Sequence, residues 1–127
     1  MVGISVPNVA NPTLDWLRGV TPPPVAGIYA QLHIGQPGAN GTTNPSAVTT
    51  RVQVTENPAS GGAMTMASVS GSWSMTATET ITHISLHDSP SGGKFLASGE
   101  LDDPRPVAAG DTLTLIKCTV ATTTPAT

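Results

Sequence analysis

The fold is decided by the stretch LHIGQPGANGTTNPSAVTTR, residues 32–51, and by its counterpart TITHISLHDSPSGGKFLASG, residues 80–99. In each stretch, a short run of alternating apolar and polar residues breaks into a turn rich in Gly, Pro, Asn or Ser. This pattern is typical of a β-strand that ends in a tight turn. Neither stretch carries the residues that catalysis needs. The pair therefore predicts strands joined by turns and offers no catalytic centre.

The composition of the chain agrees with a single β-rich domain. It has 127 residues, of which 10% are charged and 3% aromatic, so the polar surface must come from Ser, Thr, Asn and Gln. Few aromatic rings also mean a modest core, because these rings supply the largest buried area per residue. The 13 Gly and 12 Pro punctuate the chain, while the 38% hydrophobic content and the net charge of -3 argue against disorder.

Alternating residues locate the strands. Residues 28–34 alternate between aliphatic side chains and Tyr, Gln or His, which predicts a half-buried strand. Residues 101–111, which include Pro104 and Pro106, are predicted to form a loop. Further strands are predicted at 48–54, 63–69, 72–77, 80–86, 94–97 and 112–120, with 63–69 and 72–77 forming a pair around Gly71. The fold class that follows is mostly β, a compact antiparallel β-sandwich or barrel.

Residues 1–26 are predicted to form an extended N-terminal arm that carries one short helix at 11–18. Asn11 suits a helix cap, Pro12 suits the first helical position, and Gly19 can end the helix. Residues 1–10 are expected to be extended, and Thr21 is followed by a stiff Pro-rich spacer. The β domain is then predicted at 27–121 and a low-complexity C-terminal tail at 122–127.

The side chains that could support catalysis or metal binding do not form a recognisable site. His83 and His87 lie four residues apart in a predicted strand, which separates them by about 13 Å, too far for one ion. We interpret these two histidines and His33 as surface or interface residues. No Ser lies in a Gly-x-Ser-x-Gly elbow, and the lone Cys118, in an apolar strand-like run, is predicted to be a buried, inert thiol. We expect no catalytic residue, no metal and no cofactor.

Charge and hydropathy argue against two classes of partner. The 5 Lys and Arg residues are scattered along the chain and form no basic stripe for a phosphate backbone. No segment approaches the roughly 18 apolar residues that a membrane helix needs. We therefore expect neither nucleic acid nor a membrane as a partner.

The arm supplies most of the candidate interface residues. A two-turn helix is too short to be stable alone in water, so it must dock on its own sheet or on a neighbour. Trp73 is expected to pack in the core, whereas an intermolecular pocket and intramolecular docking are equally plausible for Trp16. The predicted interface residues are Leu14, Trp16, Leu17, Pro22, Pro23, Pro24 and Tyr29.

The region from Tyr29 to Leu115 resembles a family of small virion structural proteins from tailed phages of actinobacteria, labelled tail fibre, minor tail or head decoration proteins. Two positions depart from the family pattern, which usually has Asp in place of Gln36 and Trp in place of His87. The matching pieces are residues 32–38, Asn44 and Pro45, Arg51, Trp73, residues 82–88, residues 93–96 and residues 110–113.

The resemblance implies a non-enzymatic virion protein that assembles in the cytoplasm of the bacterial host. Our main hypothesis is a capsid decoration protein that binds the lattice of the major capsid protein, copies of itself, or both. The alternative is a minor tail or tail fibre protein that contacts other tail proteins and helps attachment to a host surface saccharide. A wall hydrolase is disfavoured because the chain lacks a positioned acid and base.

Overall fold

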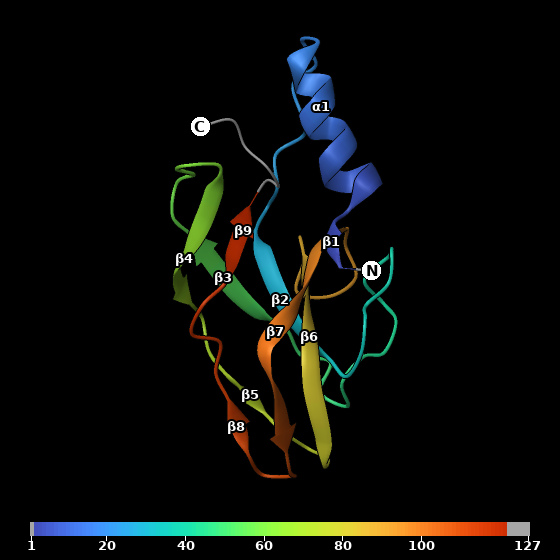
Figure 1. Ribbon diagram of the computed structural model, residues 1–127, viewed down its shortest axis with the longest axis vertical. Helices are drawn as coiled ribbons and strands as arrows, with labels where there is room; N and C mark the ends of the chain where they lie inside the picture. Colours follow the sequence, from blue (N-terminus) through green and yellow to red (C-terminus); the bar gives the residue numbers. More distant parts are fainter. Residues whose placement is uncertain (1, 122–127) are drawn as a thin grey trace.

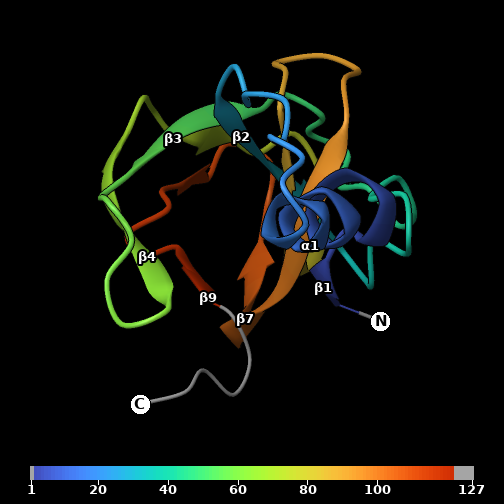
Figure 2. The same ribbon diagram turned by 90° about the horizontal axis from the view of Figure 1, so that it is seen from above.

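A curved antiparallel sheet forms the body of the protein, seen in a computed structural model that describes residues 2–121 (Figures 1 and 2). Seven strands in the order β1-β7-β6-β2-β3-β4-β9 form a half-barrel, and β5 pairs with β8 in a small second sheet. The predicted mostly β fold with one short N-terminal helix is confirmed. The elements are β1 (Gly3–Ile4), η1 (Val6–Ala10), α1 (Asn11–Leu17), β2 (Ile28–His33), β3 (Val52–Glu56), β4 (Ala63–Val69), β5 (Trp73–Ser74), β6 (Glu79–His87), β7 (Phe95–Val107), β8 (Thr112–Leu113) and β9 (Thr119–Ala121).

The hydrophobic core is formed by one set of alternating residues of the main sheet, which packs against residues of the small β5-β8 sheet. Ala30 and Leu32 of β2 are fully buried and belong to one cluster with Val52 and Val54 of β3. Trp73 is 2% exposed, and its indole Nε1 donates a hydrogen bond to the Thr50 carbonyl oxygen at 3.0 Å. The prediction that Trp73 packs in the core is confirmed. The rest of the cluster comprises Val48, Met75, Ile81, Leu86, Leu96, Ala97, Val107 and Cys118.

The other set of alternating residues on β2 and β6 is buried as well, and it is polar. Gln31, His33, His83, Ser85 and His87 are all buried. The connection 34–45 folds back against the end of β2, since its backbone bonds Ile34 to Asn44 and Leu32 to Ser46. Two predictions are therefore wrong: the first strand is not half-buried, and the three histidines are not surface residues. Alternation shows which residues share a face, but not whether a connecting segment covers that face.

Strand β7 runs through a segment that was predicted to be a loop. Its pairing with β6 runs from Phe95 to Glu100 and resumes from Arg105 to Val107, and residues 101–104 between these parts have no register partner on β6. Beyond Ser98, β7 has no partner other than β6 in the described part of the chain, so its second edge is free. Because proline is tolerated where no ladder hydrogen bond is needed, Pro104 and Pro106 do not end this strand.

Two further strand predictions need correction. Residues 63–69 and 72–77 do not pair with each other: β4 pairs with β3 and β9, and β5 pairs with β8. The single strand predicted at 112–120 is divided into β8 and β9. The sequence pattern located these segments but could not assign their partners, which lie far away along the chain.

The first residues of the chain form an edge strand of the sheet, and the helical residues that follow leave the sheet. Strand β1 pairs with Ala97 and Ser98 of β7, and residues 6–10, expected to be extended, form a short π-helix capped by the Ser5 hydroxyl. Helix α1 continues from it, confirming the helix predicted at 11–18, and projects beyond the end of the half-barrel (Figure 1). The division at residue 26 stays a prediction, and the tail predicted at 122–127 lies outside the described residues.

Candidate functional site

Helix α1 carries three large apolar side chains of the N-terminal arm that are strongly exposed. Leu14, Trp16 and Leu17 are 62%, 61% and 74% exposed, although side chains of this size are usually withdrawn from water. We call these three residues the arm surface. Leu14 and Leu17 are three residues apart and share one side of the helix, while Trp16 points to another. The helix thus offers apolar contacts on two sides, and its own sheet covers neither.

The arm is tied to the sheet on the N-terminal side of this helix. The Asn8 side-chain amide donates a hydrogen bond to the Phe95 carbonyl oxygen at 2.9 Å, which ties η1 to the start of β7. At the other end, the Val20 amide donates to the Asp15 carbonyl oxygen. The exposed residues Pro22, Pro23 and Pro24 then return the chain to β2. Prolines fix their own backbone angles, so this return segment is stiff.

Tyr29 lies apart from the other predicted interface residues. It is half-buried in the middle of the sheet, where its register partners are Gln53 on β3 and His87 on β6. The structure therefore brings six of the seven predicted interface residues together in the arm and places Tyr29 in the sheet.

An apolar pocket opens at the end of the half-barrel from which α1 projects. Its volume is about 530 Å³, within the roughly 300–1,000 Å³ range of clefts that bind small ligands. We call it the apical pocket. Sequence reasoning missed it, because its lining comes from eight elements and their connections. It is lined by Ile4, Val9, Val25, Gly27, Ile28, Gln53, Val54, Thr55, Glu56, Met64, Leu86, Leu96, Ala97 and Val120.

Among the described residues, Glu56 is the only acidic side chain that lines the apical pocket. Its two carboxyl oxygens are shielded from solvent, and neither makes a hydrogen bond of ordinary geometry within residues 2–121. The polar group that it faces is the Cys118 thiol, a weak donor. Burial raises the pKa of Glu56, while the hydrogen bond with Cys118 acts in the opposite direction. A carboxylate in this position lacks compensation for the water that it has lost.

Cys118 is a buried thiol, as predicted. Burial, together with the neighbouring Glu56, raises its pKa to about 12. Since the thiolate is the reactive form, a thiol with this pKa is a poor nucleophile at neutral pH.

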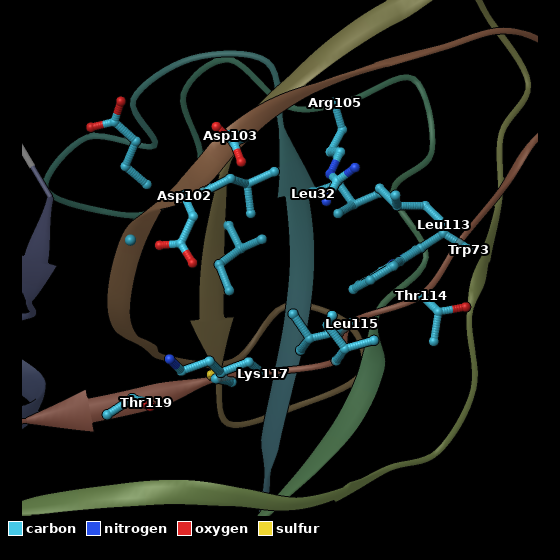
Figure 3. Close-up of a pocket in the computed structure, with 16 residues that line it drawn as sticks. Leu32, Trp73, Asp102, Asp103, Arg105, Leu113, Thr114, Leu115, Lys117 and Thr119 are labelled. Carbon is cyan, nitrogen blue, oxygen red and sulfur yellow. The ribbon is translucent and has the colours of Figure 1, made fainter.

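A second, wider cleft lies along the free edge of β7 (Figure 3). It has a volume of about 780 Å³ and contains Asp102, Asp103, Arg105 and Lys117. None of these four charges forms an ion pair with another residue in the described part of the chain. Trp73 lines the cleft but is itself buried. The cleft is thus a mixed polar surface without an exposed aromatic ring.

A polar network on the second face of the sheet contains residue types that are familiar from catalysis. His33 Nε2 lies 2.7 Å from Ser85 Oγ, and Ser85 Oγ lies 2.9 Å from His87 Nε2. His33 Nδ1 lies 2.8 Å from the Thr43 carbonyl oxygen and must donate to it, so Nε2 of the neutral ring accepts the Ser85 proton. Burial lowers the pKa of both histidines, that of His87 to about 4.

This network ties the sheet to the segments that cover it. Arg51 donates from Nε to the Gln31 side chain and from Nη1 to the carbonyl oxygens of Ser89 and Gly92. Ser85 is fully buried and lines neither of the two clefts. A substrate therefore has no route to the Ser85 hydroxyl in this structure. The hydrogen bonds of the network instead hold the covering segments against the sheet.

The described residues, 2–121, offer neither a clustered metal site nor a membrane-spanning helix. They contain no cluster of three or more His, Cys, Asp or Glu side chains that could hold a metal ion. No helix within them combines the length and the apolar character needed to cross a bilayer.

Comparison with known proteins identifies a phage structural family. A model of the family described as podophage GP4 fiber I protein gp80 matches residues 7–123. A comparison with curated proteins found no match. The match supports the phage virion part of the resemblance drawn from the sequence, and its description mentions neither an actinobacterial host nor a head decoration protein. Since the match spans the arm and nearly all of the sheet, the chain belongs to the family of the podophage GP4 fiber I protein gp80.

Proposed function

We propose that the protein is a non-enzymatic structural component of a phage fibre, held in the virion by its N-terminal arm. The family description names a fibre protein, which favours the tail fibre hypothesis over capsid decoration. The non-enzymatic assignment is supported by the burial of Ser85 and the two histidines beside it, away from both clefts.

The observation that carries the proposal is the arm surface. Burying a large apolar side chain contributes about 1.5–3 kcal/mol relative to leaving it exposed. Leu14, Trp16 and Leu17 are each more than half exposed, so covering them would release a large part of this free energy. Repetition of such a contact over several copies in an assembly strengthens the whole attachment.

The experiment is to count copies of the protein per virion by quantitative mass spectrometry for variants of the arm. Trp16→Ala and Leu17→Ala are expected to lower the copy number strongly. The matched control is Ile116→Ala, because Ile116 is also a highly exposed aliphatic residue but lies at the cleft beside β7. Full incorporation of both arm variants would overturn attachment through the arm.

The same measurement on the unmodified phage tests fibre against capsid. We expect a small number of copies in a fixed ratio to the tail proteins. A copy number that follows the major capsid protein would overturn the fibre assignment in favour of capsid decoration.

Binding of a host surface saccharide by this chain has weaker support than attachment to the virion. Such sites need an exposed aromatic ring on which a sugar can stack. Of the four aromatic residues, Trp73 and Phe95 are buried, Tyr29 is half-buried, and only Trp16 is exposed. The proposed role of this chain is therefore attachment and assembly within the fibre.

A further inference from the structure

We propose that His33, Ser85 and His87 form a latch on the 34–45 connection that holds one added proton in the folded protein and opens when a second arrives. We call residues 34–45 the cover. The capacity of the latch is limited by the number of hydrogen-bond donors and acceptors that meet at the Ser85 hydroxyl. The three side chains are at most 2% exposed, so water cannot replace a partner that one of them loses.

With both histidines neutral, the hydrogen bonds of the latch run in one direction. His33 Nδ1 donates to the Thr43 carbonyl oxygen of the cover, so its Nε2 has a lone pair and accepts the Ser85 proton. Once the Ser85 hydroxyl has donated its one proton to His33, its oxygen must accept from His87 Nε2, 2.9 Å away. The two histidines are therefore opposite tautomers, with the proton on Nδ1 of His33 and on Nε2 of His87.

One further proton can bind without breaking any of these hydrogen bonds. Burial lowers the pKa of His87 to about 4, while a hydrogen bond to the backbone of Gly41, in the cover, acts in the opposite direction. Because Nε2 of His87 is directed at Ser85, the bond to Gly41 involves Nδ1, the nitrogen that carries no proton in the neutral ring. A proton on this nitrogen is a donor to the cover and leaves the bonds of Ser85 unchanged.

A second proton finds no such position. It would bind His33 Nε2 and turn that nitrogen into a donor toward Ser85, as His87 Nε2 already is. The Ser85 oxygen would then face two donors while its own proton had no acceptor, since Oγ has no other partner in the described part of the chain. A buried donor without an acceptor is costly, and water reaches it only when the cover opens.

The charges around the latch act in the same direction. After burial, which is the main cause, the charge of Arg51 lowers the pKa of both histidines of the latch, and His83 lowers that of His33. Asp88 acts in the opposite direction on the other histidine. The cover has no ionisable side chain, and Tyr29, the register partner of that histidine, supplies a neutral phenol. No charge on the cover can therefore compensate a second proton.

The number of protons taken up on opening follows from this limit. In the open state each histidine binds a proton below its usual pKa of 6.5, whereas the closed latch holds no added proton above about pH 4 and one below it. Opening takes up two protons between these pH values and one below the lower value. The open population should therefore rise roughly 100-fold per pH unit in the first range and roughly 10-fold per unit in the second.

The first test is ¹⁵N NMR of the imidazole rings in the unmodified protein, which needs no variant. At neutral pH we expect the Nδ1–H tautomer for His33 and the Nε2–H tautomer for His87. As the pH falls, only His87 should become doubly protonated while the cover stays closed. The same tautomer in both rings, or two doubly protonated rings under a closed cover, would overturn the latch.

The second test is amide hydrogen exchange as a function of pH, corrected for its intrinsic pH dependence. The Ile34 amide donates to the Asn44 carbonyl and the Ser46 amide to the Leu32 carbonyl, so both report on the cover. Their protection should fall with the two slopes given above. The controls are two amides outside the cover, of Ser70 and Met75, which donate to the carbonyls of residues 53 and 111 and should stay protected. Equal loss at all four amides would show that the cover opens only by unfolding of the whole chain, and would overturn the latch.

Two glutamine variants test which histidines count. His87→Gln keeps an N–H donor for Ser85 but cannot take up a proton, so the cover should open with roughly a 10-fold rise per pH unit throughout. His83→Gln is the matched control, because His83 is a buried histidine on the same strand that bonds Thr82 and not Ser85. It should keep the roughly 100-fold slope above pH 4. A 100-fold slope that survives in His87→Gln, or is lost in His83→Gln, would overturn the assignment of the two protons to the latch.

Discussion

His33 on β2 and Ser85 on β6 are joined across the sheet by a hydrogen bond of 2.7 Å between Nε2 and Oγ, and both side chains are fully buried. Ser85 also bonds His87 two residues further along β6. A buried polar network of this kind strengthens a fold only while each member keeps its partners. The protonation of these histidines therefore affects the stability of the whole sheet.

Acid is expected to destabilise the protein between pH 6.5 and about pH 4. The folded state holds His87 neutral, with a pKa of about 4, whereas the unfolded chain binds a proton below the usual value of 6.5. Because the unfolded state then binds more protons, its free energy falls as the pH falls. His87 alone should lower the free energy of unfolding by on the order of 3 kcal/mol across this range. Urea unfolding midpoints at a series of pH values would measure it.

His87→Gln is the control for this assignment. Because glutamine does not titrate, the stability of the His87→Gln variant should depend less on pH than that of the unmodified protein. The residual dependence should come from His33, whose pKa burial also lowers. An identical pH dependence in the two proteins would show that His87 is not the group responsible.

The sequence predicted those features that local chemistry determines. The helix at 11–18 follows from a proline at its start and a glycine after its end, and α1 spans Asn11–Leu17. The strand predicted at 80–86 follows from simple alternation, and β6 spans Glu79–His87.

Features that depend on distant segments could not be predicted in this way. The burial of the histidines depends on the connection 34–45, which folds back over the sheet. The apical pocket depends on the order of the strands, since Glu56 and Val120 become neighbours there only because β4 lies between β3 and β9. Strand β7 passes Pro106 because its second edge is free, and it passes Pro104 within the stretch that has no register partner on β6, neither of which a local pattern reveals.

Gly41→Ala is expected to destabilise the protein by roughly 2–5 kcal/mol, the sum of backbone strain and overpacking. Gly41 has a φ of 69°, and a Cβ at this position would overlap the ring of Phe95. Gly92→Ala is the matched control, because Gly92 has a φ of 62° but no atom within 4 Å of its Cβ position. Gly92→Ala should lower the free energy of unfolding by about 1–2 kcal/mol, from backbone strain alone. Equal losses of unfolding free energy in the two variants, measured by urea unfolding, would contradict the contact between the 34–45 connection and Phe95.

Glu56→Gln is expected to stabilise the isolated chain at neutral pH. Burial raises the pKa of Glu56, so the folded state disfavours the charged form. For an acid with a raised pKa, stability is lost as the pH rises from the unfolded value of 4.5 through the folded one. The gain in the free energy of unfolding from Glu56→Gln should therefore be present at pH 7.5 and become smaller toward pH 4. A variant chain that is less stable than the unmodified one at pH 7.5 would show that the carboxylate has a partner within the fold.

The same substitution is expected to affect the stability of the protein strongly at one tryptophan and hardly at the other. Trp73 is 2% exposed and bonds the Thr50 carbonyl, so Trp73→Ala should lower the free energy of unfolding by about 3–5 kcal/mol. Trp16 is 61% exposed on α1, and Trp16→Ala should change this free energy by less than about 0.5 kcal/mol. Urea unfolding of both variants would measure the difference. A large loss for Trp16→Ala would show that α1 packs on its own sheet, and the arm would then no longer be free to bind a partner.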